Sequence, residues 1–206
     1  MNQNLGTSLE IASATDPGMV RSHNEDSIGT DAEIGLAVLA DGMGGYNAGE
    51  VASGIAVAML TTEMKQALGD HDPHASDGSG ELMAEKFVRE NSAKANAAIY
   101  QTAKSQPQYS GMGTTLVIAL FFDNRMTVGH IGDSRLYRLR EDALEQVTRD
   151  HSLLQEQIDS GMISKEQARF SQNKNLVTRA VGIDPEVETR SEEHTSELQS
   201  HLNLVC

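Results

Sequence analysis

The sequence has no tryptophan, only one cysteine and only four prolines among its 206 residues. Four phenylalanines and four tyrosines bring the aromatic share to just 4%. The core must therefore be built from Ala, Val, Leu, Ile and the nine Met residues. Because Cys206 is the one cysteine, the sequence excludes an internal disulfide framework and a thiolate metal site.

Positive charge is also scarce, since 16 Lys and Arg face 30 Asp and Glu, for a net charge of −14. This balance argues against a nucleic-acid or membrane-surface binder, because both need clustered positive charge. No apolar run approaches the roughly 20 residues that span a bilayer. The first 18 residues have neither the basic start nor the apolar core of a signal peptide. We therefore expect a cytoplasmic monomer without nucleic-acid or membrane partners.

Hydrophobic periodicity separates strands from helices along the chain. Apolar runs of strand length cover Leu9–Thr15 and Ile34–Ala40. From about Ala48, apolar residues recur at three- and four-residue steps, which predicts an amphipathic helix up to the polar loop Gly69–Gly80. A second helix is expected from about Glu81 to Lys104.

After the two helices, the pattern of strand length returns. Four further strands are expected over Thr114–Phe122, Met126–Ile131, Arg135–Leu139 and Leu144–Thr148. Short helices are expected at His151–Gly161 and at Ser164–Arg169, the second with Ser164 as its cap. Strands grouped before and after two adjacent helices do not alternate as in a parallel βαβ fold. The sequence therefore predicts an α+β layered domain with mostly antiparallel strands.

Three acidic segments each lie beside the end of an expected strand, at Arg21–Asp26, Asp41–Gly45 and Gly132–Ser134. Taken singly, each is typical of a turn or an exposed charge pair. Together they indicate a site for Mg²⁺ or Mn²⁺, which prefer carboxylate and carbonyl oxygens. Gly42 would let its carbonyl approach a metal without a Cβ in the way. Arg21 would suit a phosphate, because its planar guanidinium matches the geometry of that anion.

At these residues the chain resembles the metal-dependent protein serine/threonine phosphatases of the 2C type, in their bacterial form. The resemblance runs from about Ile11 to Glu188, and its catalytic domain would cover residues 9–188. Seven motifs in family order carry it: R-x-x-N-E-D at Arg21–Asp26, V-L-A-D-G-M-G-G at Val38–Gly45, a small-residue segment at Gly49–Ser53, M-G-T-T-L at Met112–Leu116, G-D-S-R-x-Y at Gly132–Tyr137, T-x-D-H-S-L at Thr148–Leu153 and L-x-x-R-A-x-G at Leu176–Gly182.

The resemblance implies a fold and a chemistry. The fold would be a four-layer αββα sandwich of two antiparallel sheets flanked by helices, here without its last strands. Two Mn²⁺ or Mg²⁺ ions, with a site for a third, would activate a water that attacks phosphoserine or phosphothreonine directly. The partners would be phosphorylated proteins, namely a bacterial Ser/Thr kinase and its substrates.

The resemblance also implies roles for single residues. The expected metal ligands are Glu25, Asp26, Asp41, Gly42 and Asp133. Asp41 would bridge two ions, Gly42 would give its carbonyl, and Asp133 would serve the additional ion. Arg21 would bind the substrate phosphate and, with Asp41, carry catalysis.

The sequence departs from the family at two places. Met43 stands where many eukaryotic relatives have a histidine, and a thioether cannot donate a proton. After Glu188 the chain lacks the S-D-G and D-N motifs whose aspartates also bind metal, and the segment 189–206 is mostly polar without a period. We expect a truncated domain followed by a disordered or foreign tail.

These departures keep other functions open. One alternative is a catalytically inactive fragment of the same fold that binds phosphoproteins or regulates. An ester hydrolase with Ser134 as nucleophile is disfavoured, because the sequence has no G-x-S-x-G elbow. His151 is expected to be structural, at the start of a helix.

Overall fold

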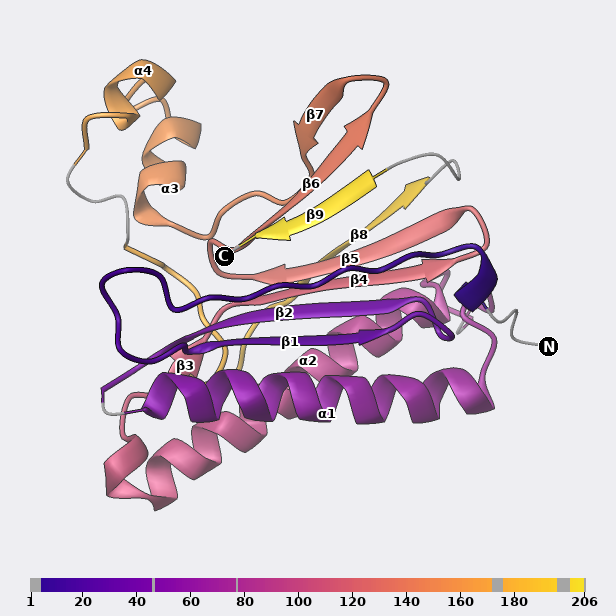
Figure 1. Cartoon of the computed structure of the whole chain (residues 1–206), viewed down its shortest axis with the longest axis horizontal. Coiled ribbons are helices and arrows are strands. Elements are labelled where there is room, and N and C mark those ends of the chain that lie inside the picture. Colours follow the sequence, from indigo (N-terminus) through magenta and orange to yellow (C-terminus); the bar gives the residue numbers. More distant parts are fainter. Residues whose placement is uncertain (1–4, 46, 77, 172–175, 196–200, 206) are drawn as a thin grey trace.

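The computed structural model describes residues 5–45, 47–76, 78–171, 176–195 and 201–205 (Figure 1). In chain order its elements are η1 (Leu5–Thr7), β1 (Asp26–Asp31), β2 (Leu36–Met43), α1 (Ala48–Asp70), α2 (Met83–Ser105), η2 (Pro107–Tyr109), β3 (Gly113–Thr114), β4 (Leu116–Phe122), β5 (Arg125–Ile131), β6 (Arg135–Arg140), β7 (Ala143–Gln146), α3 (Leu153–Asp159), α4 (Lys165–Ala168), β8 (Arg190–Thr195) and β9 (His201–Val205).

Two antiparallel sheets form the centre of the molecule. The larger has the strand order β1-β2-β4-β5-β8, with the short β3 paired to the end of β2. The smaller has the order β7-β6-β9. Helices α1 and α2 cover one face of the large sheet, and the small sheet lies over the other (Figure 1). The prediction of an α+β fold with two antiparallel sheets and flanking helices is confirmed.

The two faces of β2 show why this sequence makes a layered fold. Side chains alternate between the faces of a strand, so Leu36, Val38 and Ala40 pack in the core beneath the helices. Leu39 points the other way, into a second core between the sheets, where Leu136 of β6 is also buried. One strand therefore supplies both hydrophobic layers.

The helices follow the sequence expectation closely. On α1 the buried residues Leu60, Met64 and Leu68 recur every four positions, which places them on one face. Ser164 caps α4, because its side chain accepts a hydrogen bond from the Gln167 backbone, as predicted. Helices α3 and α4 lie beside the small sheet rather than across it (Figure 1). No helix in the described part of the chain has the apolar length that crossing a membrane requires.

Near the N-terminus the structure departs from the prediction. Leu9–Thr15, expected as a strand, forms no strand, and its side chains are exposed or half-buried. Without a buried face or a partner strand, alternation alone does not create a sheet. The first strand is instead β1, whose residues all pair with β2.

The tail also differs from the expectation of disorder. Arg190–Thr195 pairs with β5, and His201–Val205 pairs with β6. Pairing at a sheet edge uses backbone N–H and C=O groups, so it needs no apolar pattern in the added strand. The disordered tail is therefore a wrong prediction for these two segments, while the domain limit at Glu188 stays a prediction.

Candidate active site

Two aspartates meet at one end of the large sheet. The register of β1 and β2 places Asp26 directly opposite Asp41, and such partners have Cβ atoms only about 5 Å apart. Burial and, next, the charge of the neighbouring Asp26 raise the pKa of Asp41 from 3.8 to about 6. Two carboxylates in this arrangement repel each other, so the site favours a bound cation.

The backbone of Asp41 is held on both sides by the M-G-T-T-L motif. Its N–H donates to Thr115 Oγ1 at 3.0 Å, and its carbonyl accepts from the Thr115 backbone N–H at 2.9 Å. Thr114 Oγ1 donates to the same carbonyl at 3.0 Å. The carboxylate therefore projects from a fixed segment of chain, as expected for a residue that directly follows a buried run.

Gly42 packs where no side chain fits. A Cβ on Gly42 would overlap the Gly49 carbonyl and lie 2.6 Å from the Glu25 carbonyl oxygen. Gly49 is equally confined, because its Cβ would lie 2.6 Å from Glu25 Oε1. The two glycines thus bring the start of α1 against Glu25, a packing reason that the sequence analysis did not foresee.

Arg21 lies at the exposed side of this site. Its Nη1 is 3.2 Å from Glu25 Oε2, while 67% of its side chain remains exposed. Its positive charge lowers the pKa of Asp41 and so opposes the effect of Asp26. The guanidinium is thus both close to the acids and open to an anion from solution.

Asp133 belongs to a different part of the chain from Asp26 and Asp41. It lies in the Gly132–Ser134 segment that links β5 to β6, and its charge contributes to the raised pKa of Asp41. Burial raises the pKa of Asp133 itself, with a further rise from Asp150 and an opposing effect from Arg135. The structure therefore brings Asp26 and Asp133 each within electrostatic reach of Asp41.

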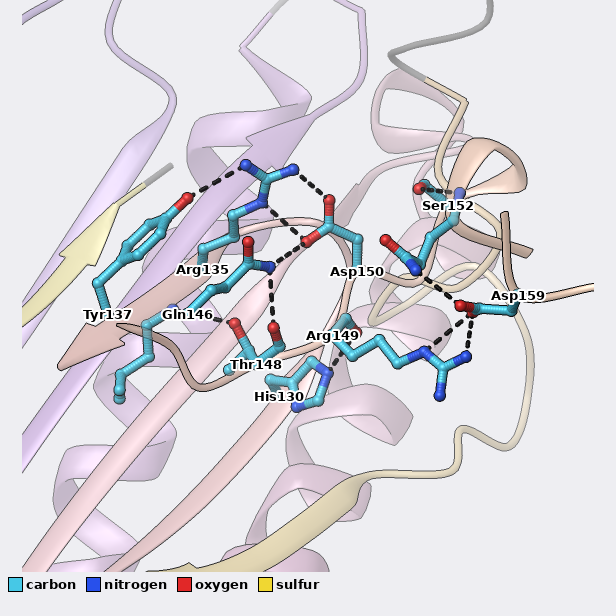
Figure 2. Close-up of polar contacts among 11 residues, drawn as sticks. His130, Arg135, Tyr137, Gln146, Thr148, Arg149, Asp150, Ser152 and Asp159 are labelled. Carbon is cyan, nitrogen blue, oxygen red and sulfur yellow. Dashed lines mark hydrogen bonds and ion pairs between the residues drawn. The ribbon is translucent and has the colours of Figure 1, made fainter. Parts of the chain in front are cut away.

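A second polar cluster, which the sequence motifs did not predict, is centred on Arg135 and Asp150 (Figure 2). Arg135 binds Asp150 through two hydrogen bonds, of 2.8 and 2.6 Å, and also donates to Tyr137 Oη at 3.1 Å. Gln146 Nε2 donates to Asp150 Oδ1 at 3.1 Å. The only signal in the sequence was that Arg135 and Asp150 each belong to one of the seven motifs.

His151 holds the Asp133 segment through hydrogen bonds of its ring and its backbone to Gly132. Its Nδ1 accepts from the Gly132 N–H at 3.1 Å, and its backbone N–H donates to the Gly132 carbonyl at 2.8 Å. The ring stacks on His130, with centroids 4.7 Å apart. Burial and the neighbouring His130 lower the pKa of His151 to about 4. A neutral, half-buried acceptor agrees with the structural role expected for His151.

The donor set suits a hard cation. Asp26 and Asp41 offer oxygen ligands side by side, and a divalent ion would relieve the repulsion that raises the pKa of Asp41. Across the described residues, no group of three or more His, Cys, Asp or Glu is already close enough to form a complete metal cage. The residues therefore fit a metal site built on two adjacent carboxylates, with Asp133 nearby.

Comparison with known proteins identifies the family. Residues 20–181 match the model for protein phosphatase 2C. The serine/threonine phosphatase stp of Listeria innocua is 37% identical over 180 residues, which cover 84% of this chain and 67% of that protein. The phosphatase PstP of Mycobacterium tuberculosis is 40% identical over 173 residues, 84% of this chain but only 31% of that protein.

Solved structures agree with the sequence comparison. The M. tuberculosis PstP/Ppp crystal structure covers 94% of this chain and 76% of its own, at 36% identity and a TM-score of 0.82. The PstP catalytic domain in complex with two manganese ions covers 94% and 75%, at 35% identity and a TM-score of 0.78. This chain belongs to the protein phosphatase 2C family.

Proposed function

We propose that this chain carries the catalytic centre of a metal-dependent phosphatase that hydrolyses phosphoserine and phosphothreonine in proteins. The observation that carries the proposal is the half-buried Asp26–Asp41 pair, in which burial and the neighbouring Asp26 charge raise the pKa of Asp41 to about 6. Such a pair favours a cation, and the relatives named serine/threonine phosphatases supply the reaction class.

In this proposal Asp41 and Asp26 hold the ions, Gly42 gives its carbonyl, and Asp133 serves an additional ion. When bound, such ions acidify a coordinated water and neutralise charge on the transferring phosphoryl group. The protein's own contribution is orientation: the Thr115 bonds fix Asp41 in place. Glu25, which contacts Arg21 at 3.2 Å, is a further carboxylate proposed to bind metal.

Arg21 is the proposed phosphate-binding residue. Its guanidinium is mostly exposed and is held at 3.2 Å from Glu25, close to the acids. A planar guanidinium can donate two parallel hydrogen bonds to a phosphate and so orient the phosphorus toward the ions. It also offsets part of the net charge of −14, which would otherwise repel an anionic substrate.

The number and the identity of the metal ions are also part of the proposal. Two ions are supported by the PstP structure with two manganese ions, whereas oxygen ligands suit Mn²⁺ and Mg²⁺ alike. A Ser/Thr kinase and its substrates as partners, a cytoplasmic location and a monomeric state stay predictions of the sequence.

The direct test is phosphate release from a phosphothreonine peptide by the purified chain. We expect release with Mn²⁺, loss of release with EDTA, and recovery when Mn²⁺ is restored. Asp41→Asn should abolish release, whereas Asp142→Asn, the same change in an exposed turn, should not. Equal release in EDTA would contradict a metal-dependent mechanism.

The alternative, an inactive phosphoprotein-binding fragment, is favoured by one observation. No group of three metal-binding side chains comes together among the described residues. In that case the same peptide, labelled with a fluorophore, would bind in an anisotropy titration without releasing phosphate. Arg21→Ala would weaken that binding, so turnover and binding together separate the two functions.

A further inference from the structure

Thr115 touches both acidic segments of the site. Its Oγ1 accepts from the Asp41 N–H at 3.0 Å and is 2.7 Å from Ser134 Oγ. Its backbone N–H donates to the Asp41 carbonyl at 2.9 Å. The side chain is only 3% exposed, and Ser134 only 4%. The two hydroxyls therefore connect Asp41 to the neighbour of Asp133 through a buried path.

The same side chain also packs against the other neighbour of Asp133. A Cβ placed on Gly132 would lie 2.8 Å from both Thr115 Cβ and Thr115 Cγ2. The Gly132 backbone, at φ +106°, is in the region that favours glycine. Thr115 thus contacts Gly132 through carbon and Ser134 through oxygen, on the two sides of Asp133.

We propose that Thr115 is a positioning residue that sets Asp41 and Asp133 relative to each other. The inference rests on the proposed function, because it assigns these acids to one metal site. The hydroxyl is the essential part, since without it the Asp41 N–H loses its hydrogen-bond partner at a half-buried position. The methyl group supports Gly132 and contributes packing alone.

Four variants separate these contributions. Thr115→Val keeps the shape and removes the hydroxyl, whereas Thr115→Ser keeps the hydroxyl and removes the methyl. Ser134→Ala removes the hydroxyl at the other end of the bond. Thr127→Val is the matched control, because Thr127 is fully buried in β5 and its hydroxyl has no hydrogen-bond partner among the described residues.

The main measurement is the Mn²⁺ dissociation constant from isothermal titration calorimetry. Groups that orient metal ligands typically change metal affinity by about 10- to 100-fold when removed. We expect about a tenfold weaker affinity for Thr115→Val and a weaker affinity for Ser134→Ala. Thr115→Ser should stay within about twofold of wild type, and Thr127→Val should be unchanged. In kinetics with p-nitrophenyl phosphate, kcat should fall more than KM rises for Thr115→Val.

Hydrogen exchange gives a second measurement that needs no metal. In the EDTA-treated protein, the Asp41 amide should exchange faster in Thr115→Val than in wild type, and Thr115→Ser should restore its protection. Urea unfolding shows whether each variant folds. If Thr115→Val does not fold, Ser134→Ala carries the test of affinity.

Two outcomes would overturn the inference. One is Mn²⁺ affinity and Asp41 exchange in Thr115→Val that equal those of wild type. The other is a Thr115→Ser variant that binds Mn²⁺ as weakly as Thr115→Val, which would assign the effect to packing. If the variants show the expected Mn²⁺ affinities and Asp41 exchange rates but the wild-type chain releases no phosphate, the proposed function is contradicted and the positioning role stands.

Discussion

Replacing Asp41 by asparagine should stabilise the metal-free protein at neutral pH, even though it removes a proposed metal ligand. Burial and the Asp26 charge raise the pKa of Asp41 from 3.8 to about 6, so the ionised carboxylate is disfavoured in the folded state. Asparagine has nearly the same shape, carries no charge and can donate a hydrogen bond to Asp26. It therefore resembles the protonated form that the folded chain prefers.

The size of this stabilisation and the pH range in which it appears follow from the same two pKa values of Asp41. Below pH 3.8 both the folded and the unfolded chain keep the Asp41 proton. As the pH rises from 3.8 to about 6, the unfolded chain loses that proton first, so stability falls across this window and stays low above it. The full difference corresponds to about 3 kcal/mol. Because Asp41 is only half-buried, solvent screening reduces the expected gain of the variant to about 1–2 kcal/mol.

Urea unfolding in EDTA, at pH 5 and at pH 8, measures the effect. We expect the free energy of unfolding of Asp41→Asn to exceed that of wild type by more at pH 8 than at pH 5. Asp142→Asn, in an exposed turn, should change stability by less than about 0.5 kcal/mol at either pH. With saturating Mn²⁺ the order should reverse, because only wild type gains stability from strong metal binding.

Two results would refute this reasoning. An Asp41→Asn variant less stable than wild type at pH 8 in EDTA would show that the carboxylate stabilises the fold. A gain of equal size at both pH values would show that its titration plays no part.

Three further expectations follow from the site. Arg21→Ala should raise KM for a phosphothreonine peptide about tenfold with a smaller change in kcat, and a fall in kcat alone would contradict its binding role. Gly42→Ala should lower the free energy of unfolding by about 2 kcal/mol, because its Cβ would overlap a backbone carbonyl of α1, whereas Gly45→Ala has open space and should change little. Asp150→Asn should cost about 1–2 kcal/mol in thermal unfolding, since it leaves the half-exposed Arg135 without its charged partner. An unchanged melting temperature would show that this pair contributes nothing.

Local patterns predicted the elements that are strongly periodic. Helices α1 and α2 and strands β4 and β5 each carry their apolar face within one continuous segment, so periodicity finds them. Strand β1 was missed because Asp26–Asp31 has only one large apolar residue, Ile28, and becomes a strand through its pairing with β2. The tail strands were missed for the same reason, since sheet edges pair through the backbone.

The candidate site was predictable as a set of residues but not as an arrangement. The acidic motifs named Asp26, Asp41 and Asp133, because acidic segments beside the ends of expected strands are recognisable in sequence. The sequence could not show that Asp26 lies opposite Asp41, since strand register depends on the turn between the strands. Thr115 is 74 positions from Asp41, and only the folded chain brings its hydroxyl to that backbone.

The short link at Asp133 also gives the molecule a mechanical property. Gly132, Asp133 and Ser134 form the whole connection between β5 in the large sheet and β6 in the small one. Because three residues cannot absorb a large displacement, a movement of the small sheet against the large one would be transmitted to Asp133. Asp41 stays with the large sheet, on β2. A sliding of the small sheet against the large one would therefore act against the Thr115 contacts to Gly132 and Ser134, which hold the two acids relative to each other.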